Sequence, residues 1–135
     1  MPSFDDETRH RRLQIGVVQP FTDLKVWQHG HRLVLAIYRL TAAFPSDERF
    51  GITSQLRRAA VSVPTNIAEG SKRLTDAEFA RFLNIAEGSL VETQYLLMLS
   101  RDLGFAGAEV DALLAKTTEA AKMLHGLRVR VSRGR

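Results

Sequence analysis

One segment of the chain, residues 51–73, has a helical pattern that a proline interrupts. Its apolar residues recur every three or four positions, which places them on one face of an α-helix. They are Ile52, Leu56, Ala59, Val63 and Ile67. Pro64 interrupts this face, and a proline inside a helix removes one backbone donor and clashes with the preceding turn. The segment is therefore predicted to form a bent helix or two short helices.

A hexapeptide within this segment occurs a second time. Residues 66–71 read Asn-Ile-Ala-Glu-Gly-Ser, and residues 84–89 repeat the same sequence. The flanking residues differ, so we interpret the repeat as two helical surfaces with the same need for small residues. Glycine inside a helix costs about 1 kcal/mol relative to alanine, so Gly70 and Gly88 indicate a tight contact that offsets this cost. That contact lies either within one bundle or between subunits.

The residues that precede this segment predict a helix with a wide apolar face. Thr22 is the expected N-cap, because a threonine side chain accepts a hydrogen bond from a free backbone amide at a helix start. Phe21 and Val26 have the spacing of a hydrophobic staple around this cap. The helix is expected to end at Phe44-Pro45.

Two longer helices are expected after the proline-containing segment. Thr75 and Glu78 have the spacing of a capping box, and the helix that they begin is expected to stop at residues 102–104. The last helix begins near Glu109 and continues to Val131 with apolar residues alternately three and four apart. No segment alternates like a β-strand, and short connections favour antiparallel neighbours. We predict an all-α fold: an up-down-up-down antiparallel four-helix bundle with a proline-kinked second helix.

The chain is expected to be a single domain with two tails. Residues 1–20 lack periodicity and are predicted to be a mobile tail, residues 21–131 form the bundle, and residues 132–135 are a basic tail. The 135 residues include no cysteine, and no apolar run approaches the roughly 18 residues of a membrane span. Acidic and basic residues occupy the start of the chain, where a signal peptide would be apolar. We expect a cytoplasmic protein without membrane contact.

Three groups of residues resemble one protein family. They are residues 21–27 (FTDLKVW), residues 55–70 (QLRRAAVSVPTNIAEG), and Phe82, Leu83, Gly88, Ser89 and Glu92. Together they closely resemble the 23S rRNA intervening-sequence proteins over about residues 21–127. The resemblance implies a four-helix protomer that assembles into a cyclic homopentamer. It also implies a distant relation to the accessory variability protein of diversity-generating retroelements, which works with a reverse transcriptase and its RNA.

The resemblance also bears on the small and polar residues. It places recurrent polar positions of the family at Arg57, Arg58, Asn66, Glu69 and Glu92, without a reaction attached to them. It favours a subunit interface as the reason for the helical glycines. The residues assigned to an oligomer interface or a structural motif are Arg57, Arg58, Pro64, Asn66, Glu69, Gly70, Gly88, Ser89 and Glu92.

Motifs of catalysis and metal binding are sparse. Four-helix bundles often hold paired metals through Glu-x-x-His motifs on facing helices, but the one match, Glu7 to His10, falls in the predicted tail. Neither a Gly-x-Ser-x-Gly nor a Ser-x-x-Lys nucleophile motif occurs. We therefore expect no enzymatic activity, no metal, no cofactor and no small-molecule substrate.

Two carboxylates are interpreted as ion-pair partners in place of catalytic groups. Glu69 and Arg73 are four residues apart, a helix pairing worth about 0.2 to 0.5 kcal/mol. If the second and third helices fold back about Arg73, Glu87 comes level with residue 59, within reach of Arg57 or Arg58. Either pair is preferred to a functional carboxylate.

The predicted topology collects basic residues at one end of the bundle. Both chain termini and the turn between the second and third helices would lie there. The opposite end would carry Asp47, Glu48, Asp102, Glu109 and Asp111 against Arg49 and Arg101. Clustered lysine and arginine attract phosphate backbones by releasing counterions, which favours RNA as a ligand. The residues assigned to nucleic-acid binding are Lys72, Arg73, Arg128, Arg130, Arg133 and Arg135.

Two functions of different classes remain open. The first is a non-enzymatic homo-oligomer whose basic end binds RNA or a nucleic-acid enzyme. The second is a scaffold or accessory subunit that recognises a protein partner and makes no contact with nucleic acid. The net charge of +4 is small, so the distribution of charge carries the first hypothesis.

Overall fold

The computed structural model describes residues 20–134, and helices are the only regular elements in this range. Four α-helices and two short 3-10 turns follow one another, and no β-strand occurs in this range. The elements are η1 (Phe21–Asp23), α2 (Lys25–Thr41), η2 (Ser46–Glu48), α3 (Ile52–Ser71), α4 (Asp76–Asp102) and α5 (Glu109–Ser132). The prediction of an all-α protein with four helices is confirmed. The predicted tail lies outside the described residues, apart from Pro20.

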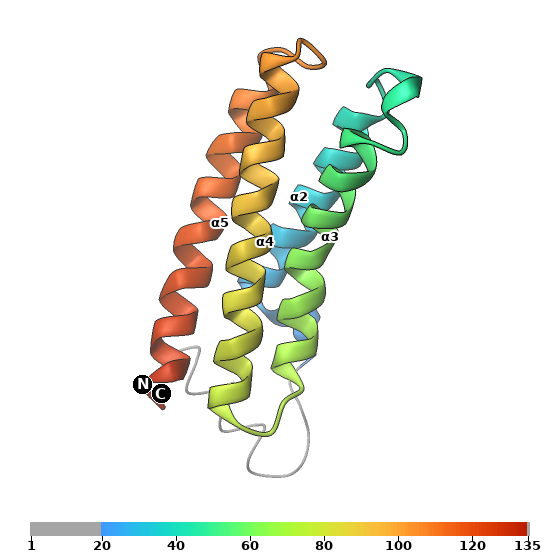
Figure 1. Cartoon of the computed structure of the whole chain (residues 1–135). Coiled ribbons are helices and arrows are strands. Elements are labelled where there is room, and N and C mark those ends of the chain that lie inside the picture. The colour runs from blue at the N-terminus through green and yellow to red at the C-terminus, as the bar shows by residue number, and fades with distance from the viewer. Residues whose placement is uncertain (1–19, 135) are drawn as a thin grey trace.

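The four helices lie side by side (Figure 1). α3 packs against α2 and α4, and α5 packs against α4 and α2. Figure 1 shows the α3–α4 turn and the C-terminal end of α5 at the same end of the molecule. The α2–α3 and α4–α5 connections lie at the opposite end.

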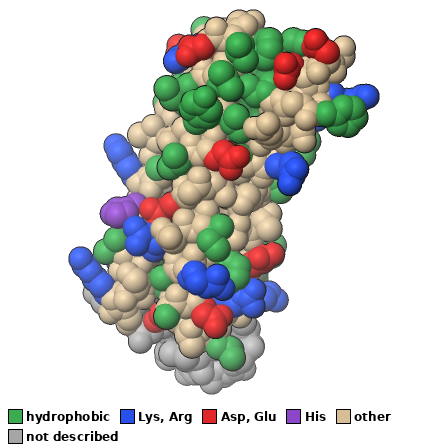
Figure 2. Space-filling model, viewed as in Figure 1, with side chains coloured by type: hydrophobic (Ala, Val, Ile, Leu, Met, Phe, Trp, Pro, Cys, Tyr) green, Lys and Arg blue, Asp and Glu red, His purple; other side chains and the backbone are tan. Residues whose placement is uncertain are grey.

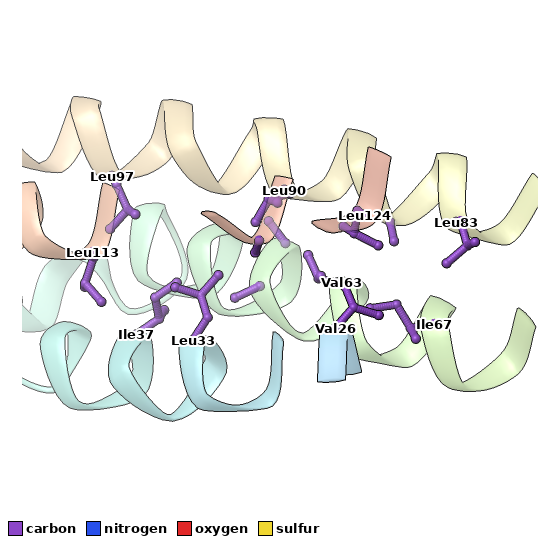
Figure 3. Close-up of a cluster of buried hydrophobic side chains, with 14 of the residues drawn as sticks. Val26, Leu33, Ile37, Val63, Ile67, Leu83, Leu90, Leu97, Leu113 and Leu124 are labelled. Atoms are coloured by element: carbon purple, nitrogen blue, oxygen red, sulfur yellow. The ribbon is translucent and has the colours of Figure 1, made fainter. Parts of the chain in front are cut away.

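Apolar side chains from all four helices meet along the axis of the bundle (Figure 3). Full burial of a leucine or isoleucine side chain contributes roughly 1.5 to 3 kcal/mol, so this core is the main source of stability. The labelled members are Val26, Leu33 and Ile37 from α2, Val63 and Ile67 from α3, Leu83, Leu90 and Leu97 from α4, and Leu113 and Leu124 from α5.

Pro64 lies inside α3, which is continuous from Ile52 to Ser71. The alternative of two short helices is therefore wrong. The proline is buried, and its ring lies beside α2, where a Cβ added to Gly30 would come within 3.6 Å of it. Packing of the ring against a glycine on α2 stabilises a single helix here, in spite of the lost backbone donor.

Helix ends were predicted well where a side chain or a glycine defines them. The Oγ1 atom of Thr75 accepts a hydrogen bond from the backbone amide of Glu78 at 3.2 Å, which confirms the predicted N-cap of α4. Gly104 follows the end of α4 with a φ of 78°, a conformation that favours glycine.

The predicted cap at Thr22 is wrong. α2 begins at Lys25, and Leu24 is the cap residue without a side-chain hydrogen bond. Thr22 instead lies within η1, where backbone hydrogen bonds to Pro20 and Phe21 close the turn. The ring of Phe21 contacts the ring of Trp27, with centroids 5.1 Å apart.

Candidate nucleic-acid and subunit interfaces

The predicted basic residues of α5 and the α3–α4 turn lie at one end of the molecule. Lys72 and Arg73 belong to the turn, and Arg130 and Arg133 to the end of α5, and all four are exposed. Figure 2 shows lysine and arginine side chains over this part of the surface, with some acidic ones among them. Arg135 lies outside the described residues. We call these four exposed cations the basic end.

Arg128 differs from the four residues of the basic end. It is half-buried, and its Nε atom donates to Oε2 of Glu87 on α4. Nδ1 of His125 lies 3.6 Å from the other carboxylate oxygen of Glu87. The predicted pairing of Glu87 with Arg57 or Arg58 is wrong, because Glu87 is on the side of α4 that faces α5. The charge of Arg128 is largely compensated within the chain.

Arg73 packs on an aromatic ring. Its guanidinium carbon lies 4.6 Å from the centroid of Phe82, and that of Arg81 lies 4.9 Å from the same ring. Among the described residues Arg73 forms no ion pair with Glu69, so that predicted pair is wrong. α3 ends at Ser71, so Arg73 lacks the helical geometry of the pair. A cation–π contact of about 0.5 to 1 kcal/mol outweighs the helix pairing.

Acidic residues also lie at this end, and the sequence-based prediction of a basic end did not include them. Asp76 and Glu78 occupy the first turn of α4, directly after the basic turn. Carboxylates are stabilised at a helix N-terminus by the helix dipole, which explains their position. The basic end is therefore an arrangement of cations around two carboxylates and not a uniformly positive surface.

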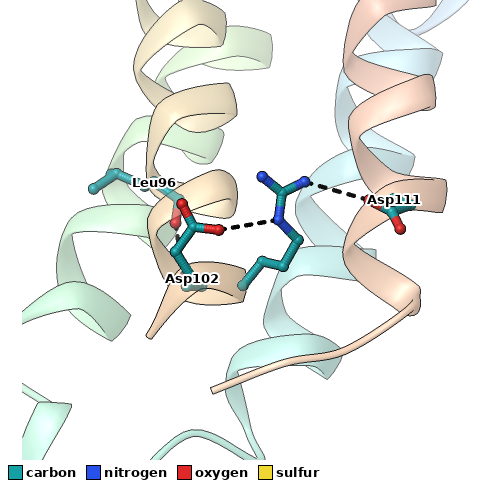
Figure 4. Close-up of polar contacts among 5 residues, drawn as sticks. Leu96, Asp102 and Asp111 are labelled. Carbon is teal, nitrogen blue, oxygen red and sulfur yellow. Dashed lines mark hydrogen bonds and ion pairs between the residues drawn. The ribbon is translucent and has the colours of Figure 1, made fainter. Parts of the chain in front are cut away.

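The opposite end of the molecule carries acidic residues in structural roles. Arg101 donates to Asp102 at 3.3 Å and to Asp111 at 3.4 Å, which links α4 to α5 (Figure 4). Oε1 of Glu48 accepts from the backbone amide of Ile52 at 3.2 Å, and Oε1 of Glu109 accepts from that of Gly107 at 2.7 Å. Four of the carboxylates at this end therefore have hydrogen-bond or ion-pair partners within the chain.

Several residues assigned to a motif make contacts within α3 or between α3 and α4. The hydroxyls of Ser62 and Ser89 lie 2.7 Å apart, and Nδ2 of Asn66 donates to the Ser62 carbonyl at 2.8 Å. A Cβ added to Gly70 would lie 2.6 Å from Cβ of Phe82. For Gly70, Asn66 and Ser89 the structure thus shows contacts within one chain.

The two adjacent arginines of α3 have different surroundings. Arg57 is tied to α2: its Nε atom donates to Oγ1 of Thr41 at 2.7 Å, and its guanidinium lies 4.4 Å from the ring centroid of Tyr38. Arg58 is exposed and lines a hollow of about 280 Å³ between α3 and α4, which Glu92 also lines. Arg57 thus anchors two helices, whereas Arg58 is exposed and forms no ion pair among the described residues.

The outer face of α4 carries a row of exposed apolar side chains. Val91 is 62% exposed, Tyr95 60% and Met98 43%. With Gly88 they are three, four and three residues apart, so they form one stripe along the helix. A Cβ added to Gly88 would meet no atom of the described part of the chain within 4 Å. We call Gly88, Val91, Tyr95 and Met98 the α4 stripe.

The two copies of the repeated hexapeptide have different surroundings. Ile67 is fully buried and Gly70 is buried against α4, whereas Ile85 is 41% exposed and Gly88 is open. The interpretation of two surfaces with the same packing need is therefore wrong for the single chain. The first copy packs inside the bundle, and the second faces outward.

A groove lies between the outer faces of α2 and α3. It consists of two hollows of about 360 and 390 Å³, both of which Val61 and Thr65 line. In the first hollow the ring of Trp27 stacks on that of His31, with ring centroids 5.0 Å apart, and Glu69 also lines this hollow. Arg58 lines the second hollow. Sequence reasoning missed this α2–α3 groove, although the four-residue spacing of Trp27 and His31 is a signal of an aromatic surface pair.

Residues 20–134 contain no group of three or more side chains placed to hold a metal ion, and Glu7 and His10 lie outside them. None of the described helices has the length and hydropathy that a bilayer crossing requires.

Four packed helices without a strand in the described range define an all-α four-helix protein. The model of the 23S rRNA-intervening sequence protein family matches residues 22–126, so the chain belongs to this family. The fold of this chain is similar to a crystal structure from Bacteroides thetaiotaomicron VPI-5482, that of a protein with unknown function from the S23 ribosomal protein family. The two share 24% sequence identity with a TM-score of 0.69, over 76% of this chain and 97% of that one. No curated protein gives a significant match.

Proposed function

We propose that this chain is a subunit of a cyclic homo-oligomer, a pentamer, whose basic end binds RNA or a nucleic-acid-processing partner. Its protomer is an up-down-up-down antiparallel bundle with a bend at Pro64, and its role in the cytoplasm is binding without catalysis or a cofactor. The observation that carries the proposal is the joint position of Lys72 and Arg73 with Arg130 and Arg133.

Two segments far apart in the sequence supply these cations. Each lysine or arginine that neutralises a phosphate releases a condensed counterion, and this release favours binding at low salt. A cyclic assembly of parallel subunits would place one basic end per subunit on the same face. The separate fields would then add, and several weak sites would act on one long ligand.

A second function is favoured by a different observation. The α4 stripe and the α2–α3 groove are apolar surfaces of the kind that bind proteins. Within residues 20–134 the basic end presents cations without an exposed aromatic ring for base stacking. The chain would then be a scaffold or accessory subunit for a protein partner. A partner that stays bound during purification with nuclease supports this alternative.

The basic end is tested by paired substitutions in the full-length chain. Arg130→Gln with Arg133→Gln removes two cations, and the control, Arg39→Gln with Arg49→Gln, removes two exposed arginines elsewhere. In titrations with a structured RNA, the slope of log affinity against log salt should fall by about 1.4 to 1.8 in the first variant. The control should keep the slope of the native chain.

An equal decrease of this slope in both variants, or no decrease in either, would contradict the proposal. Substitution is a better test than truncation after Leu127. Val131 is only 4% exposed, and Arg128 holds Glu87, so truncation would also remove packing between α4 and α5.

A further inference from the structure

Two apolar surfaces of different shape lie on different helices of the chain. The α4 stripe is a row of protruding side chains, whereas the α2–α3 groove is hollowed along its length. A two-fold dimer uses the same patch on both subunits, while a head-to-tail contact joins two different patches and generates a ring if the rotation closes. A chain with one protruding and one hollow apolar surface has the components of a head-to-tail contact.

We propose that the α4 stripe of one copy packs into the α2–α3 groove of the next copy. This inference rests on the proposed homo-oligomer and names its two contacting surfaces. The occupant of the groove is a second copy of this chain, with Tyr95 and Val91 entering beside Val61.

The charges beside the two surfaces are complementary. Arg58 and Glu69 on α3 are eleven residues apart, which is about 16 Å along a helix and nearly the same angular position. Arg81 and Glu92 on α4 have the same spacing and the same order of charges along the chain. Because α3 and α4 run in opposite directions in Figure 1, positive and negative charges face each other at both levels.

The heights of these residues follow from contacts within one chain. Arg58 and Glu92 line the same hollow, so they lie at the same height along the bundle axis. Phe82, next to Arg81, lies against Gly70, next to Glu69, so the second pair is level too. Rotation about an axis parallel to the helices preserves height, and each pair therefore matches between neighbouring copies.

These charges are available for a contact between copies. Among the described residues Arg58, Glu69 and Glu92 take part in no ion pair, although Arg58 and Glu92 line one hollow. A neighbouring helix in the groove would bring opposite charges beside them and exclude water from the apolar row. Opposite charges along an interface fix its register and orientation more than they raise its affinity.

Gly88 fits the same contact. Glycine in the middle of a helix is unfavourable relative to alanine, and no atom of residues 20–134 fills the space that its missing Cβ leaves. Close approach of a neighbouring helix accounts for the residue. Gly88 begins the α4 stripe. The neighbouring helix would therefore approach closest beside Val91 and Tyr95, the two most exposed side chains of the stripe.

The absence of cysteine from the chain gives a direct test by cross-linking. Val61→Cys places one thiol in the groove, and Val91→Cys places one on the stripe at a similar height. The two single variants are co-expressed, treated with a short bis-maleimide and resolved on a denaturing gel. A dimer in which residue 61 of one copy is linked to residue 91 of another is expected, with no dimer from either variant alone.

Controls separate this inference from the oligomer proposal itself. Ala112→Cys, on the exposed face of α5, replaces Val61→Cys in the control mixture and should give no dimer with Val91→Cys. An oligomer by light scattering that gives no 61–91 link, or a dimer from Val91→Cys alone, overturns the head-to-tail pairing only. A monomer under all conditions overturns both the pairing and the homo-oligomer.

Discussion

Replacing Gly70 by alanine should lower the free energy of unfolding by about 1 to 3 kcal/mol. The added Cβ would lie 2.6 Å from Cβ of Phe82 and 3.0 Å from Cδ1 of Phe79. A Cβ–Cβ contact cannot be relieved by rotation of a side chain, so α3 and α4 must separate. The separation would also loosen the Ser62–Ser89 hydroxyl contact, which lies between the same two helices. The measurement is equilibrium unfolding in urea, followed by circular dichroism.

Gly126→Ala is the matched control for this substitution. Gly126 also lies inside a helix, but the nearest atom to its added Cβ is the end of the flexible Arg130 side chain at 3.5 Å. Alanine should raise stability there by up to about 1 kcal/mol, through helix propensity alone. Equal effects at the two positions would show that the α3–α4 contact does not need a glycine.

Replacing Gly88 by leucine should dissociate the proposed homo-oligomer while the fold is kept. A Cβ at this position would meet no atom of residues 20–134 within 4 Å, so the helical signal and the urea midpoint of the monomer should change little. Between chains it would occupy the place where we propose that the neighbouring helix approaches. Light scattering should show the molar mass falling toward the 15.1 kDa of a single chain.

Ala112→Leu tests whether any exposed leucine has this effect. It adds a similar side chain to an exposed position on α5, away from the α4 stripe, and should leave the mass of the assembly unchanged. An unchanged mass for Gly88→Leu would count against an interface on the α4 stripe. A fall in mass for both variants would point to general loss of solubility.

The helices were predictable because their signals are local. The apolar periodicity and the Thr75 and Gly104 signals depend on residues within a few positions of each other, and the structure agrees with them. The start of α2 was missed because backbone hydrogen bonds of η1 define it, without a side-chain cap. Backbone turns of this kind leave little trace in residue type.

The surroundings of the repeated hexapeptide were not predictable from its sequence. The same six residues pack inside the bundle in α3 and face outward in α4. α4 has apolar residues on two faces, one in the core and one on the α4 stripe. Periodicity alone therefore does not reveal which face of α4 is buried, and the choice depends on the neighbouring helices.

The sequence predicted which charged residues lie near the basic end, but it did not predict which side chains they contact. Which cations are compensated depends on the rotation of α4 about its axis, which turns Glu87 toward Arg128 and Phe82 toward Arg73. This rotation is a property of the packed core. A sequence shows that a carboxylate and a guanidinium exist, whereas packing decides whether they meet.

Photochemical cross-linking of the full-length native protein to a structured RNA, followed by peptide mapping, tests binding at the basic end most directly. The cross-linked peptides should contain Lys72 and Arg73 from the α3–α4 turn, and Arg130 and Arg133 from the end of α5. Cross-links confined to the opposite end, around residues 45–51 and 102–111, would contradict RNA binding at the basic end. The absence of any cross-link at low salt would contradict it too.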